Sequence, residues 1–377
     1  MLVFGQPLIS EEEINEVVDS LRRSWLGTGP KVHRFENDFS EYKGVPSSVA
    51  VNSCTAALHL ACVALNFKPQ DEVITSAMTF CATINAIIHS GATPVLADID
   101  PQTLNIDPAQ IEKRITKKTK AILVIHFAGR PCAMNEIMAI ANARGLAIIE
   151  DCAHAIESEY HGQKTGTFGD FGCFSFYSTK NITTGEGGMV ISRHEDLLNK
   201  IKIMALHGMS HDAWKRFSDD GYKHYYVVEH GFKYNMMDIQ AAIGIHQLKQ
   251  IENYWKKRER VWNNYLSAFA GTDLNLPSKA EENTRHAYHL FTIGIDQKKS
   301  GMSRDQFLEE MTKRNIGVGV HYLAVPEHPY YRKEFGWNPS DYPNARSHGQ
   351  ETVSLPISPK LSDQDLEDVV NAVKDIL

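Results

Sequence analysis

The sequence lacks any apolar run long enough to cross a membrane. A membrane-spanning helix needs about 18–20 apolar residues, whereas the longest apolar stretches here, such as Ala121–Ile125, have the length of a strand. No basic segment precedes an apolar one at the N-terminus, which runs directly into Glu11–Glu13. We therefore expect no targeting segment and no membrane partner, and we predict a cytoplasmic protein.

An excess of positive charge is also missing. The 377 residues include 39 Lys and Arg against 46 Asp and Glu, which gives a net charge of -7. Proteins whose main partner is a nucleic acid usually carry a basic surface. We therefore expect no nucleic-acid partner, although a local basic pocket could still hold a phosphate.

Cysteine is sparse, and the familiar metal-binding spacings are absent. Only six cysteines occur, none lies beyond Cys173, and no Cys-x-x-Cys pair is present. Neither His-Glu-x-x-His nor a four-ligand spacing occurs, and no Gly-x-G-x-x-Gly or phosphate-binding loop motif is found. The sequence therefore predicts reduced, packed cysteines and no metal site.

The chain is long enough for two folding units, because single hydrophobic cores stop growing near about 250–300 residues. Short apolar runs alternate with segments of helical length from residue 47 to about 200, which indicates crossover units and a mainly parallel sheet buried on both faces. A long amphipathic helix is predicted over 238–269. The remainder predicts a small α+β unit, with strand-like segments at 289–295 and 318–322. We predict an α/β protein with a large unit over 1–250 and a small C-terminal unit over 251–377.

Lys180 is the only basic residue between Thr165 and Ser192, and it stands between an aromatic segment and a glycine turn, Gly185–Gly188. Desolvation would lower the pKa of its amine and make it a usable nucleophile toward a carbonyl group. The alternative is a lysine at a strand end whose aliphatic stem is buried and whose ammonium group reaches solvent.

Two further segments point to a ligand site. Asp151 follows the predicted buried strand Leu146–Ile149, and open α/β sheets bind ligands beyond the carboxyl ends of their strands. Its carboxylate could pair with a cationic ring nitrogen, or it could cap the next helix. The segment Val49–Leu58 turns abruptly from strand to helix, and small residues at a helix N-terminus expose amides to an anion. An amine, a carboxylate and a phosphate cup are the parts that a pyridoxal phosphate enzyme needs.

The sequence resembles the nucleotide-sugar aminotransferases of pyridoxal phosphate fold type I (DegT/StrS-like), from about residue 4 to the C-terminus. It is most similar to the UDP-4-amino-4-deoxy-L-arabinose–oxoglutarate aminotransferases of lipid A modification. The segments that carry the resemblance are Ser24–Lys31, Asn52–Leu58, Thr79–Phe80, Glu150–Ala155, Phe174–Asn181, Glu186–Gly188, Gly231–Asn235 and His286–Phe291. The resemblance implies a large, mainly parallel α/β domain and a smaller C-terminal α+β domain.

The resemblance also implies roles for particular residues. Lys180 would bond the cofactor and carry the proton during the reaction, Asp151 would keep the pyridine nitrogen protonated, and His154 would lie beside the ring. The implied cofactor contacts are Thr55, Ala56, Phe80, Asp151, His154, Ser175, Lys180 and Asn235. Among them Phe80 would stack on the ring, and Asn235 would reach the phosphate from the other subunit of a homodimer. Cys54 departs from the family, which commonly has Gly or Ala there.

The substrates implied by the resemblance are L-glutamate, with 2-oxoglutarate as its product, and a nucleotide-linked keto-sugar, in particular a UDP-4-keto sugar for the synthesis of cell-surface polysaccharide or lipopolysaccharide. Thr28, Glu186, His321 and Tyr322 are the predicted sugar contacts. His321 could instead be a capped histidine at a strand end, and Glu186 could be a carboxylate of a turn.

Two other functions are compatible with the same fold. A sugar dehydratase of this family has histidine in place of the lysine, so Lys180 speaks against it. A non-catalytic, cofactor-binding regulator would be expected to lose Lys180 or Asp151, and both are present.

Overall fold

The computed structural model describes residues 1–210 and 225–377. Its centre is a seven-stranded sheet in the order β1-β9-β8-β5-β4-β2-β3. The strands are β1 (Ser48–Val51), β2 (Glu72–Ser76), β3 (Thr93–Ala97), β4 (Thr119–Ile125), β5 (Ala147–Asp151), β8 (Phe171–Ser175) and β9 (Gly188–Ser192). The neighbours β3, β2, β4, β5 and β8 pair in parallel, whereas β9 is antiparallel to both β8 and β1. The predicted mainly parallel sheet is confirmed.

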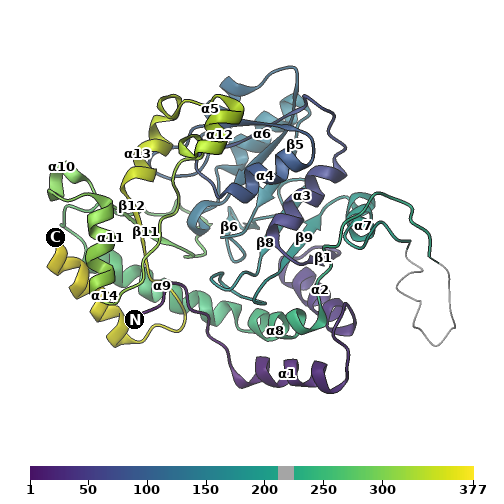
Figure 1. The fold of residues 1–377 in the computed structure, drawn as a ribbon, viewed down its shortest axis with the longest axis horizontal. Helices are drawn as coiled ribbons and strands as arrows, with labels where there is room; N and C mark the ends of the chain where they lie inside the picture. Colours follow the sequence, from purple (N-terminus) through teal and green to yellow (C-terminus); the bar gives the residue numbers. More distant parts are fainter. Residues whose placement is uncertain (211–224) are drawn as a thin grey trace.

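Both faces of this sheet are covered by helices, as Figure 1 shows. On β4, alternate residues divide between the two faces: Leu123 packs with α3 and α7, whereas Val124 packs with α5 and α6. A strand buried on both sides needs such continuous apolar sequence. The helices of this part are α1 (Glu11–Arg22), α2 (Pro30–Lys43), α3 (Cys54–Ala64), α4 (Cys81–His89), α5 (Pro108–Arg114), α6 (Met134–Arg144) and α7 (Glu195–Met204).

The predicted helix over 238–269 is wrong as one element. The structure contains α8 (Asp238–Lys249) and α9 (Ile251–Ala268), with Gln250 between them at φ -95° and ψ 0°. This ψ departs from the value of about -42° in a regular helix, and α8 ends there. The two helices also pack differently, because α8 lies against α1 and α2 while the second half of α9 belongs to the C-terminal core.

The C-terminal unit is built around an antiparallel pair, β11 (Phe291–Gly294) and β12 (Thr352–Leu355). Its core joins these strands to α9, α11 (Arg304–Lys313) and α14 (Asp363–Ile376). The predicted strand over 318–322 is wrong, because only Gly319 forms a bridge there, with Ser354. The other elements are β6 (Glu159–Tyr160), β7 (Gln163–Lys164), β10 (Thr284–Arg285), α10 (Gln297–Ser300), α12 (Pro329–Phe335) and α13 (Pro343–Glu351).

The N-terminal residues lie against this C-terminal unit (Figure 1). Leu2 forms a parallel bridge with Ile316, and its amide donates to the Asn315 carbonyl over 2.7 Å. Two residues further on, the ring of Phe4 stacks on His321 with 5.5 Å between ring centroids. The start of the chain therefore supports the segment that carries His321. Among the described helices, none is both long and apolar enough to cross a membrane.

Candidate active site

Most of the predicted site residues surround one cavity of about 420 Å³. It lies beyond the carboxyl ends of β5 and β8, next to the first residues of α3 and α4, where open α/β sheets bind ligands. Its lining includes nine of the predicted residues, namely Thr55, Phe80, Asp151, His154, Ser175, Lys180, Glu186, His321 and Tyr322. Segments that are far apart in sequence thus meet at one place.

Lys180 lies in the turn that follows β8, where its backbone amide donates to the Tyr177 carbonyl over 2.9 Å. Burial lowers the pKa of its amine to about 8, and the nearby Cys54 and Asp151 oppose that shift. Within residues 1–210 and 225–377, its ammonium group forms no hydrogen bond or ion pair. A partly buried amine that lines a cavity and has a lowered pKa can become a nucleophile at moderate pH.

Asp151 is the last residue of β5 and is 5% exposed. Its Oδ1 accepts a hydrogen bond from the Ala153 amide over 3.0 Å, and its Oδ2 accepts one from Thr83 Oγ1 over 3.0 Å. Burial raises the pKa of this carboxyl, while the two donors and the charge of Lys180 act in the opposite direction. The alternative that Asp151 caps a helix is wrong, because turns rather than a helix follow it.

The N-terminus of α3 forms one wall of the cavity. Ser53 caps this helix, and its Oγ accepts the Ala56 amide over 3.1 Å. The Ala56 amide, which the resemblance assigns to the phosphate, is thus engaged by Ser53. Ala56 is also buried and is not among the residues that line the cavity. The first helical amides, those of Cys54 and Thr55, remain available for an anion.

Gly188, at the start of β9, allows this wall to form. A Cβ atom on Gly188 would lie 2.5 Å from the backbone of Ser53, so the start of β9 can approach the start of α3 only without a side chain. The glycine at this position is therefore explained by close packing against the N-terminal end of the helix.

His154 is held as a neutral imidazole with a defined tautomer. Its Nδ1 accepts the Ala128 amide over 3.2 Å, so the proton resides on Nε2, which lies 3.1 Å from Tyr322 Oη. Burial lowers the pKa of His154 well below its ordinary value and raises that of Tyr322. His154 Nε2 therefore donates to the tyrosine oxygen, and the phenolic hydrogen of Tyr322 is free to donate to another group.

At the mouth of the cavity, Phe80 precedes α4 and is 56% exposed, with its ring centroid 5.9 Å from that of Tyr322. His321 Nδ1 lies 2.8 Å from Ser354 Oγ, and burial lowers the pKa of His321 to about 4. His321 is thus anchored as a neutral ring, but at no strand end, since no strand forms there. The exposed aromatic face of Phe80 suits a flat ligand ring.

Thr28 and Asn235 are not among the residues that line the cavity. They contact each other instead: Asn235 Nδ2 donates to Thr28 Oγ1 over 2.7 Å, and Thr28 Oγ1 donates to the Met236 carbonyl over 2.5 Å. The alternative that Asn235 caps a helix of its own subunit is wrong, because Met237 occupies the N-cap position of α8.

Several lining residues were not predicted, among them Thr79, Thr83, Tyr177 and Thr179. Thr79 and Thr83 are both buried, and their hydroxyl oxygens lie 2.8 Å apart. Thr79 lies in the bend before α4, and Thr83 lies in the first turn of that helix. Because Thr79 is outside the helix, helical spacing could not predict that the two hydroxyl groups meet.

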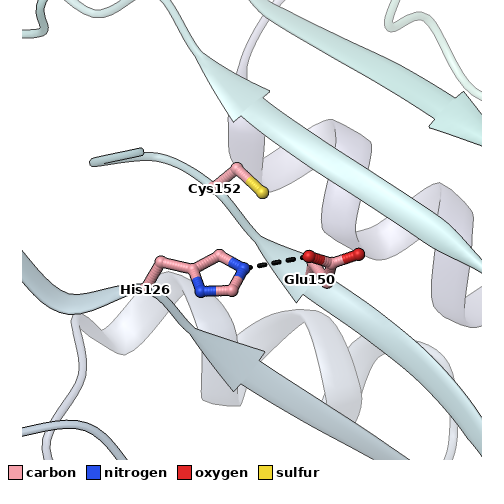
Figure 2. Close-up of side chains that lie close together, drawn as sticks. All are labelled: His126, Glu150 and Cys152. Carbon is pink, nitrogen blue, oxygen red and sulfur yellow. Dashed lines mark hydrogen bonds and ion pairs between the residues drawn. The ribbon is translucent and has the colours of Figure 1, made fainter. Parts of the chain in front are cut away.

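A second cluster lies deeper in the sheet, where Figure 2 shows His126, Glu150 and Cys152 close together. His126 Nδ1 accepts the Cys132 amide over 3.0 Å, so its Nε2 donates to Glu150 Oε2, also over 3.0 Å. The Glu150 oxygens also accept three backbone amides of the loop before β8, those of Gly166, Phe168 and Gly169. Burial raises the pKa of Cys152 well above its ordinary value, so it remains a thiol. The Glu150 carboxylate therefore holds the loop, and both it and the His126 ring are already engaged by protein partners.

The cavity fits pyridoxal phosphate on its own chemistry. Lys180 supplies an amine with a lowered pKa, Asp151 supplies a buried acid, and the start of α3 offers two amides to a phosphate group. Phe80 adds an exposed aromatic face. Free Cys54, one of six free cysteines, leaves room in the same wall because its side chain is small.

Comparisons with known proteins identify the family of the chain. The model of the DegT/DnrJ/EryC1/StrS aminotransferase family matches residues 7–374. The chain is 46% identical to the spore coat polysaccharide biosynthesis protein SpsC of Bacillus subtilis, covering 100% of this chain and 97% of that protein. Spr1654 of Streptococcus pneumoniae, assigned as a sugar aminotransferase and solved in PMP and PLP forms, aligns with a TM-score of 0.92 at 33% identity, over 100% of this chain and 97% of Spr1654.

Another solved structure, PseC of Helicobacter pylori, is an aminotransferase of pseudoaminic acid biosynthesis. It aligns with a TM-score of 0.91 at 28% identity, over 100% of this chain and 98% of PseC. The family match spans nearly the whole chain, and the solved relatives share its complete fold. The chain belongs to the DegT/DnrJ/EryC1/StrS aminotransferase family, and its cofactor is pyridoxal phosphate.

Proposed function

We propose that the protein transfers the amino group of L-glutamate to a nucleotide-linked keto-sugar, specifically a UDP-4-keto sugar, in the cytoplasm. The observation that carries this proposal is the meeting of Lys180 and Asp151 in one cavity, beside a helix N-terminus that can hold a phosphate. The cofactor supplies an electron sink for the carbon that gains or loses the amino group.

Each residue has a distinct task in this proposal. Lys180 bonds the cofactor and afterwards, as a free amine, takes and returns the proton at the reacting carbon. Asp151 holds the ring nitrogen protonated. Thr55 and Ser175 bind the phosphate, and Phe80 fixes the plane of the ring. His154 sets the hydrogen-bonding direction of Tyr322, which is thereby a donor toward an oxygen of the substrate.

The sugar occupies the outer part of the cavity in this proposal, near Glu186, His321 and Tyr322. Because its pKa is about 4, His321 is neutral near pH 7 and can contact sugar hydroxyl groups without adding charge. We assign the product to a cell-surface amino-sugar, as in polysaccharide or lipopolysaccharide. The name of the B. subtilis relative, a spore coat polysaccharide biosynthesis protein, supports the polysaccharide.

We also propose a homodimer with shared active sites. Thr28 and Asn235 lie outside the cavity of their own chain, as expected if they serve the neighbouring one. Apolar side chains around these segments are exposed, including Trp25 at 49% and Tyr226 at 71%. A second copy of the chain would bury them, and two-fold symmetry would then give two equivalent sites.

The test of the proposed reaction is a substrate panel. The purified protein, loaded with pyridoxal phosphate, is incubated with L-glutamate and with UDP-, dTDP- or GDP-linked 4-keto sugars, and both 2-oxoglutarate and the amino-sugar are measured. We expect equimolar products with a UDP-linked sugar. Amination of only dTDP- or GDP-linked sugars would overturn the nucleotide assignment.

The same assay separates the two alternative functions. A dehydratase would release a sugar that has lost a hydroxyl group and gained no amino group, and a regulator would bind the cofactor without forming either product. Position 180 holds lysine, where the dehydratases of this family have histidine, and this favours transamination over dehydration.

A further inference from the structure

The carboxylate of Asp151 is fixed by donors from three different elements. Its Oδ1 accepts the Ala153 amide, 3.0 Å away in the turn after β5, and the thiol of Cys54, 3.9 Å away at the start of α3. Its Oδ2 accepts only one hydrogen bond from the described residues, from Thr83 Oγ1 in the first turn of α4, at 3.0 Å. An ionised carboxylate has about four acceptor positions, so one position on Oδ2 remains for a ligand.

The Thr83 hydroxyl has a defined direction. Because its single hydrogen goes to Asp151, its oxygen must accept the hydrogen bond from Thr79 Oγ1, 2.8 Å away. Threonines inside helices commonly direct the hydroxyl to the carbonyl four residues earlier. Here the Thr83 hydroxyl donates to Asp151 instead. Thr79, which donates to Thr83, is itself only 2% exposed.

We propose that Thr83 is a positioning residue for Asp151, which it orients so that the remaining acceptor position of Oδ2 meets the ring nitrogen of the cofactor, and that Thr79 polarises Thr83. This inference rests on the proposed role of Asp151. Hydrogen bonds to a charged group are stronger than neutral ones, and chains of them reinforce one another. Loss of the Thr83 hydroxyl should therefore change cofactor binding more than loss of the Thr79 hydroxyl. Both residues should act only through Asp151.

The test uses isosteric Thr83→Val and Thr79→Val variants. The chain offers a matched control in Thr75, a fully buried threonine of β2 whose hydroxyl donates to the Leu123 carbonyl over 2.8 Å, with no contact to Asp151. Two properties are measured: the dissociation constant of pyridoxal phosphate and the nitrogen-15 NMR shift of its labelled ring nitrogen, which reports protonation.

We expect Thr83→Val to raise the dissociation constant by about tenfold or more, the loss expected for one hydrogen bond to a charged group, and to move the shift toward the unprotonated value. Thr79→Val should have about a twofold effect in the same direction. Thr83→Ser, which keeps the hydroxyl, should restore both readouts, and Thr75→Val should leave both unchanged. If Thr83→Val does not fold, Thr83→Ala takes its place under the same criteria.

Asp151→Asn is measured in parallel to separate two failures. If it leaves the nitrogen shift unchanged, the proposed role of Asp151 fails and the inference fails with it. If Asp151→Asn moves the shift while Thr83→Val does not, only the inference about Thr83 is overturned. An equal change in the Thr75→Val control would also overturn it, because the effect would then follow from the loss of any buried hydroxyl.

Discussion

Two regions of this protein each contain a lysine whose pKa is lowered to about 8 by burial, yet only one of these lysines has access to a ligand. Lys43, at the end of α2, is 3% exposed, donates to the Ile156 carbonyl over 3.1 Å and lies over the Phe174 ring. Lys180 lines the cavity without a bonding partner in the part of the chain that the structure describes. A lowered pKa therefore does not identify a nucleophile; access to a ligand must accompany it.

The region around Lys43 is closed, because its ammonium group is buried and bonded within one chain. The cavity around Lys180 is open at Phe80 and, in our proposal, is completed by Asn235 of a second copy. The following predictions test this difference, from the largest expected effect to the smallest.

Lys180→Ala should lower turnover by more than about a thousandfold, because it removes both the nucleophile and the base. Borohydride reduction followed by mass spectrometry should attach the cofactor to the wild-type peptide that contains Lys180 and to no peptide of the variant. The matched control is Lys43→Met, which loses one buried hydrogen bond and should be less stable by about 1 kcal/mol but should keep the covalent link. Turnover by Lys180→Ala at the wild-type rate would eliminate the assignment.

Asp151→Asn should lower turnover by about a hundredfold or more, since it keeps the shape of the side chain but removes the charge that stabilises a protonated ring nitrogen. Cofactor affinity should fall much less. Asp98→Asn is the control: Asp98 is also 5% exposed and accepts three backbone amides, but it does not line the cavity. Equal losses of activity per folded molecule in the two variants would contradict the role of Asp151.

Capture of pyridoxal phosphate by the cofactor-free protein should depend on pH. Only the neutral amine of Lys180 can bond the cofactor, and its pKa is about 8. Below that pH the capture rate, followed by absorbance, should fall about tenfold per pH unit, the slope of one titrating group. Above it the rate should level off. An inflection near the ordinary lysine pKa would show that the amine is fully solvated.

Mixing Lys180→Ala with a disruptive Asn235→Trp variant, each inactive alone, should restore activity to about a quarter of wild type. Random pairing makes about half of the dimers hybrids, and each hybrid has one intact site if the sites are shared. Differential affinity tags confirm that hybrids form. Continued inactivity of confirmed hybrids would mean that each site is complete within one chain.

Much of the site could be predicted because its main residues stand out individually. Lys180 is isolated in its segment, and Asp151 ends an apolar strand. Thr83 could not be predicted, because its role depends on Asp151, which lies 68 residues away in sequence. The contact of Ala56 with the phosphate stays a prediction, and the hydrogen bond from its amide to Ser53 could not be foreseen from the resemblance.

The fold was predictable where the apolar pattern alone decides it, as in β4. The break at Gln250 was not, because no Gly or Pro marks it and the amphipathic pattern continues into α9. We propose this break as the division between units over 1–250 and 251–377. The segment 318–322 has the composition of a strand, but only Gly319 bridges to a neighbour, so the pattern overestimated its pairing.

The pairing of Leu2 with Ile316 has a consequence for the order in which the protein assembles. The two partners are separated by most of the chain, and contacts between distant residues form slowly. On the ribosome, the first residues must wait unpaired until the segment around Ile316 has been synthesised. Phe4 reaches His321 only afterwards. Asp151 and Lys180 can therefore be in place before the N-terminal residues pack against the segment that carries His321.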